Sequence, residues 1–111
     1  MGGAMYARVA QFESDAGSLD QMVTGVRESL DRGREAMSSG QTSEEMAGLE
    51  GVRRVMMLID RGSGSNVSVI LCDTEEDLRK ADEALNKMSP DGDVRRTSVG
   101  LYEVAIDQEM R

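Results

Sequence analysis

Residues 52–72, VRRVMMLIDRGSGSNVSVILC, contain two apolar runs separated by a segment rich in glycine and serine. The runs at 52–60 and 67–72 have the length and β-branched content of strands, and the segment between them predicts a hairpin turn. Neighbouring positions are apolar in both runs, so that both sides of each strand carry apolar side chains. We therefore expect a sheet that is covered on both faces.

A helix and a final strand are predicted on the C-terminal side of this hairpin. Thr74 followed by Asp77 is a capping signal at the start of a helix. The helix then carries an apolar stripe at helical spacing, formed by Leu78, Ala81, Leu85 and Met88. The segment 89–92, Ser-Pro-Asp-Gly, is expected to end it, and residues 94–106 predict a long final strand.

The N-terminal side predicts a strand followed by a helix. Residues 5–13 form the strand, and residues 14–17 resemble a turn. Ser18 with Gln21 gives a second capping signal, and apolar residues recur at helical spacing from Leu19 to about Met37. Residues 38–45 are expected to form a polar insertion, with a short helical turn predicted at 42–46, and residues 1–4 are expected to be an N-terminal extension or a cloning remnant.

The order of these elements is β-α-β-β-α-β, in a single α+β domain over residues 5–107. It is the order of a ferredoxin-like fold, in which an antiparallel sheet carries both helices on one face. A right-handed crossover gives the sheet order 4-1-3-2. Because two helices cover only one face of an apolar sheet, we expect a homodimer in which the other faces meet.

Composition excludes several classes of function. The chain has 111 residues and a formal net charge of -8, which argues against nucleic acid and anionic membranes as partners. It contains no histidine and one cysteine, so histidine-based catalysis, a thiolate metal cluster and an internal disulfide are excluded. Because a signal region is missing, a cytoplasmic location is expected. No bound metal is expected.

Three segments resemble the antibiotic biosynthesis monooxygenase family of the dimeric α+β barrel superfamily. They are residues 5–9 (MYARV), Gly48-Leu49-x-Gly51 before a hydrophobic strand, and residues 70–78 (ILCDTEEDL). The resemblance implies a dimeric barrel with a ligand cavity in each subunit between sheet and helices. It also implies a cofactor-independent monooxygenase that acts on a small hydroxylated aromatic or quinol substrate.

Heme degradation, which some family members perform, is not expected. Those members use a helix histidine as iron ligand and a tryptophan near the end of the third strand. This chain has neither residue type, and Cys72 stands where the tryptophan would be. With two tyrosines, one phenylalanine and no tryptophan, the chain also offers little aromatic surface to a substrate. No cofactor is expected.

The candidate catalytic residues are Arg8, Tyr6 and Tyr102, which the topology brings with Cys72 to one end of the sheet. Arg8 would hold an anionic substrate oxygen, and a tyrosine would donate a hydrogen bond to it; packing at an interface is the alternative role. Cys72 precedes a helix N-terminus, so it is either a reactive thiol or a buried inert one. The candidate ligand cavity is lined by Cys72, Met22, Val26, Met88 and Leu85.

Two arginine pairs, Arg53-Arg54 and Arg95-Arg96, begin strands, and one member of each is expected to point outward. A phosphate loop at residues 62–66 is disfavoured against a hairpin turn, because the segment lacks the lysine and the following helix. Two functions therefore remain. One is the monooxygenase; the other is a non-catalytic dimer that binds a small apolar or aromatic ligand or a partner protein.

Overall fold

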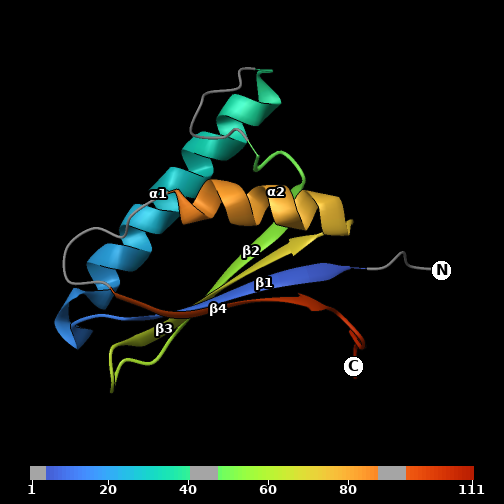
Figure 1. Cartoon of the computed structure of the whole chain (residues 1–111). Coiled ribbons are helices and arrows are strands. Elements are labelled where there is room, and N and C mark those ends of the chain that lie inside the picture. Colours follow the sequence, from blue (N-terminus) through green and yellow to red (C-terminus); the bar gives the residue numbers. More distant parts are fainter. Residues whose placement is uncertain (1–4, 41–47, 88–94) are drawn as a thin grey trace.

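The computed structural model of the chain describes residues 5–40, 48–87 and 95–111. The elements follow the predicted order (Figure 1). They are β1 (Tyr6–Glu13), the 3-10 turn η1 (Ala16–Ser18), α1 (Leu19–Ser38), β2 (Val52–Ile59), β3 (Ser65–Cys72), α2 (Glu75–Asn86) and β4 (Arg95–Glu103). The predicted helical turn at 42–46, the residues expected to end the second helix and the predicted start of the last strand lie outside the described residues.

The two later strands differ from their predicted bounds. β3 begins at Ser65, two residues before the predicted start, because Ser65 and Asn66 pair with the end of β1 despite their polar side chains. β4 ends at Glu103, and not at Ile106, because β1 offers pairing partners only as far as Tyr6. One further bond joins the Val104 amide to the Met5 carbonyl (2.8 Å).

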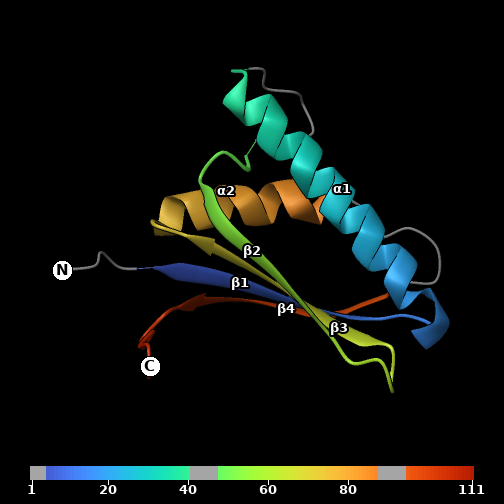
Figure 2. The ribbon, with the colours of Figure 1, turned by 180° about the vertical axis from the view of Figure 1, so that it is seen from behind.

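The four strands form one antiparallel sheet in the order β2-β3-β1-β4. This is the expected order 4-1-3-2 listed from the opposite edge. Both helices lie on the same side of the sheet in Figures 1 and 2. The chain is therefore an α+β protein with a four-stranded antiparallel sheet and two helices, which is compatible with a ferredoxin-like fold.

A tight turn joins β2 to β3. The Asp60 carboxylate accepts a hydrogen bond from the Gly62 amide (2.9 Å), and Gly64 has a φ of 82°, a conformation that favours glycine. Hydrogen bonds from the Gly62 amide, which has the larger effect, and from the Ser63 side chain lower the pKa of the Asp60 carboxyl. This segment is the predicted hairpin turn and not a phosphate loop.

The two predicted helix caps have different outcomes. The Thr74 hydroxyl accepts a hydrogen bond from the Asp77 amide (3.0 Å), which confirms the cap of α2. The predicted cap at Ser18 is wrong, because Ser18 has a φ of -100° and a ψ of 1° and lacks the extended backbone of a capping residue. Its hydroxyl donates instead to the Asp15 carbonyl (2.8 Å), and the chain enters α1 through η1.

The helices cover the sheet unequally. α2 contacts β1, β2 and β3, and it forms the core cluster of Ile70, Cys72, Leu78 and Ala81 with β3. In α1 only Leu19 and Gly33 are buried, and Figure 2 shows this helix rising away from the sheet past α2. Neither described helix is both long and apolar enough to cross a membrane.

The face of the sheet opposite the helices, here called the bare face, has apolar residues at about half of its paired positions. Because side chains alternate along strands, this face carries the neighbours of the helix-facing residues. In both views, neither helix lies on it. Its apolar members are Ala7, Val9, Met56, Leu58, Val67, Val69, Leu71 and Tyr102. The edge-strand residues Leu58 (56% exposed) and Tyr102 (57% exposed) are the most accessible of these.

Candidate functional site

The most buried charge in the described part of the chain is Arg8. It projects from the centre of β1 toward α2 and is 4% exposed. Its Nε donates to Oδ1 of Asp82 at 2.9 Å, and the Asp82 side chain is 24% exposed. A buried cation is tolerated only when it is paired, so Arg8 needs this bond to Asp82. The bond also joins the sheet to the middle of α2.

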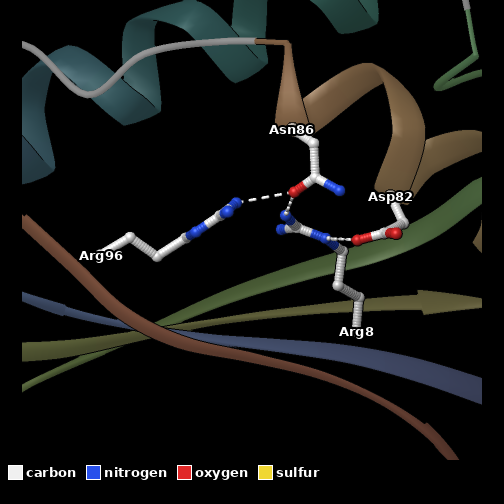
Figure 3. Close-up of polar contacts among 4 residues, drawn as sticks. All are labelled: Arg8, Asp82, Asn86 and Arg96. Carbon is white, nitrogen blue, oxygen red and sulfur yellow. Dashed lines mark hydrogen bonds and ion pairs between the residues drawn. The ribbon is translucent and has the colours of Figure 1, made fainter.

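A second arginine approaches the same place from β4. Oδ1 of Asn86, in the last turn of α2, accepts from Nη2 of Arg8 (3.2 Å) and from Nη1 of Arg96 (2.7 Å). Figure 3 shows the two guanidinium groups reaching this amide oxygen from different strands. We call Arg8, Asp82, Asn86 and Arg96 the arginine cluster.

A register shift in β4 brings Arg96 to the helix-facing side. Ser98 pairs with Gln11 and Arg96 pairs with Phe12, so that Thr97 is an extra residue in β4. Such a bulge cancels the alternation of side chains, and it turns Arg96 toward α2. The adjacent Arg95 points away and pairs with Glu13 (2.7 Å), consistent with the expectation that one arginine of the pair faces outward.

The arginine cluster carries excess positive charge. Two guanidinium groups face one carboxylate, and the oxygen that they share is a neutral amide. Because both bond that oxygen, their nitrogens lie within about 6 Å of each other. At an effective dielectric of about 20, two like unit charges about 6 Å apart repel by about 3 kcal/mol. Since Arg96 is exposed, an anion from solvent can reach the cluster.

The predicted catalytic residues are only partly brought together. Tyr6 lies on the same face of β1 as Arg8 and packs against the core cluster beside Cys72, its partner in β3. Tyr102 pairs with Ala7 and lies on the bare face, where its ring covers Gly100. The expectation that Tyr102 converges with Arg8 is therefore wrong: the two share an end of the sheet but not a face.

The residues predicted to line a cavity are also separated. Cys72 and Leu85 belong to the core under α2, whereas Met22 and Val26 are half-buried on α1 and do not pack against that core cluster. Met88 lies outside the described residues. A shallow depression of about 370 Å³ does run along α1, lined by Asp20, Gln21, Thr24, Gly25 and Glu28. It contains none of the predicted cavity residues.

The cysteine is a core residue. Cys72 is fully buried, and burial raises the pKa of its thiol, with smaller contributions from the carboxylates of Asp77 and Asp73. Of the two roles left open for Cys72, the structure supports the buried, inert thiol.

Sequence reasoning missed Asp82 and Asn86. Both follow Leu78 at intervals of four residues, so they border the apolar stripe of α2 and face the sheet. That spacing is the signal that would have identified them. For metal binding, the described residues contain no group of three histidine, cysteine, aspartate or glutamate side chains placed to hold an ion.

Comparison of the chain with protein-family models, with curated proteins and with solved structures finds no match. The resemblance to the monooxygenase family therefore rests on the short sequence segments alone.

Proposed function

We propose that this protein is a homodimer that binds a small organic anion at the arginine cluster. The observation that carries the proposal is the convergence of Arg8 and Arg96 on the single amide oxygen of Asn86. A carboxylate or phenolate oxygen placed against Arg96 would offset the excess charge and accept charge-assisted hydrogen bonds. The shared amide oxygen is a weaker acceptor than a charged one.

The two arginines have different roles in this proposal. Arg8 is buried and already bonded to Asp82, so it holds the cluster in place and supplies positive potential. Arg96 is exposed and has one bond to a neutral partner within the described chain, so its remaining donors face the ligand. Arg96 is therefore the residue whose loss should weaken binding without unfolding the protein.

The bare face supports the proposed dimer. A face of four eight-residue strands measures about 26 by 19 Å, or about 500 Å² in projection. Apolar residues hold about half of its paired positions, and Leu58 and Tyr102 are the most accessible of them to a second copy. Glu13, at one end of this face, is the only carboxylate among its paired positions, and it is bonded to Arg95. A chain of net charge -8 can associate with its copy through such a face with little repulsion.

A cofactor-independent oxygenase is the second candidate. One observation favours it: Tyr6 and Arg8 lie two residues apart on the helix-facing side of β1. A phenol beside a cation could stabilise the anion of a quinol substrate. Without Tyr102, this arrangement has one tyrosine fewer than the sequence predicted.

Binding is tested by titrating the protein with benzoate, using benzyl alcohol as a neutral probe of similar shape. Benzoate should bind and benzyl alcohol should not, and Arg96→Gln should weaken benzoate binding about tenfold or more. Arg79→Gln is the matched control, because it removes the same charge from an exposed pair on α2. Equal effects of the two variants would refute the proposed site. Oxygen uptake with a panel of quinols tests the second candidate.

A further inference from the structure

We infer that Asn66 is a second ligand contact, which donates a hydrogen bond to an uncharged oxygen of the anion bound at the arginine cluster. The inference rests on the proposed anion binding and adds a chemical requirement to the ligand. Asn66 is 4% exposed, and in the described part of the chain its Nδ2 is buried without a hydrogen-bond partner. Buried amide donors are nearly always bonded, because leaving one unpaired forfeits its hydration.

The register of the sheet places Asn66 near the arginine cluster. Phe12 pairs with Asn66 on one side and with Arg96 on the other. All three residues lie on the helix-facing side of the sheet, so Asn66 and Arg96 begin two strands apart, about 10 Å between their Cα atoms. Phe12 stands between them and offers an aromatic surface.

These three side chains define a class of ligand. Its anionic oxygen meets Arg96, its ring or other planar body lies against Phe12, and its far end carries an acceptor that meets Nδ2 of Asn66. The far group must accept a hydrogen bond and need not be charged, because Asn66 offers a neutral donor. An aromatic ring that carries a carboxylate and a ketone on opposite sides meets these requirements.

Ligand binding would also explain why an asparagine occupies a buried strand position. At the same register β2 has Ile59 and β1 has Phe12, both apolar. If the donor served only folding, a partner within the protein would be expected. A binding residue can instead keep its donor unbonded in the empty protein, at the expense of stability.

Two matched probes test the inference: 4-acetylbenzoate, which carries the ketone, and 4-isopropenylbenzoate, which has nearly the same shape but no such acceptor. Isothermal titration with the unmodified protein should show about tenfold tighter binding of 4-acetylbenzoate. In Asn66→Leu this preference should disappear while 4-isopropenylbenzoate keeps its affinity. The melting temperature of ligand-free Asn66→Leu should be unchanged or higher. Arg96→Gln should weaken both probes alike.

The possible failures are distinguishable. Equal binding of both probes to the unmodified protein would overturn the role of Asn66 and leave the anion site intact. Binding of neither probe would overturn the proposed anion site and this inference with it. A lower melting temperature of Asn66→Leu together with a retained preference would mean that the amide serves the fold. The comparison of probes on the unmodified protein needs no variant, so it holds even if Asn66→Leu fails to fold.

Discussion

Replacing Asp82 by alanine is expected to destabilise the fold more than replacing Arg8 by methionine, although both variants break the same ion pair. Asp82→Ala leaves the Arg8 guanidinium, which is 4% exposed, without a counter-charge. Breaking a buried pair in this way costs about 3 to 5 kcal/mol, and alanine returns about 0.5 kcal/mol of helix propensity. We therefore expect a loss of about 3 kcal/mol.

Arg8→Met leaves the Asp82 carboxylate, which is 24% exposed and keeps part of its hydration. Methionine also retains much of the packing of the arginine stem. The expected loss is about 1.5 kcal/mol, at the lower end of the penalty for an unpaired buried group. The double variant Arg8→Met/Asp82→Leu should lie within about 1 kcal/mol of the parent protein, because no uncompensated charge from the pair remains.

Urea denaturation at pH 7 measures these free energies of unfolding, provided that the m-value is the same for all variants. The loss in Asp82→Ala should also lower the melting temperature by about 12 °C. A smaller loss for Asp82→Ala than for Arg8→Met would refute the reasoning from burial. Losses below about 1 kcal/mol in both variants would show that the pair behaves like an exposed one.

Three further predictions concern other parts of the molecule. Leu58→Lys should convert the proposed dimer to a monomer, as measured by analytical ultracentrifugation. Leu101→Lys, at an exposed position on the other face of the sheet, should not. A dimer of Leu58→Lys would contradict an interface at the bare face. The pKa of Cys72 is raised in the folded state, so its thiol stabilises the fold fully below the unfolded pKa of 9.0 and loses this contribution as the pH rises through the higher folded value. The free energy of unfolding of Cys72→Ala, measured by urea titration, should therefore fall less at alkaline pH than that of the parent protein. Gly51→Ala should cost about 1 to 3 kcal/mol in the same assay, because the new methyl group would overlap the Asp77 side chain, and an unchanged stability would mean that α2 can shift away.

The local elements of this fold could be predicted because their signals lie within a few residues of one another. The cap at Thr74 needs only the amide of Asp77, three residues ahead, and the hairpin turn needs only the segment between two apolar runs. Apolar residues on both sides of the strands likewise predicted the bare face. The cap at Ser18 failed because the chain makes a 3-10 turn there, which directs the hydroxyl to Asp15.

The candidate site depended on relations that no local pattern contains. The sequence determined that Arg8 sits in a central strand and that Asp82 and Asn86 border the apolar stripe of a helix. Only the tertiary structure decided that these residues meet, across separations of 74 and 78 positions. The extra residue Thr97 turned Arg96 toward them, and strand register placed Tyr102 on the opposite face. Both outcomes follow from pairing between strands, where a shift of one residue exchanges the two faces.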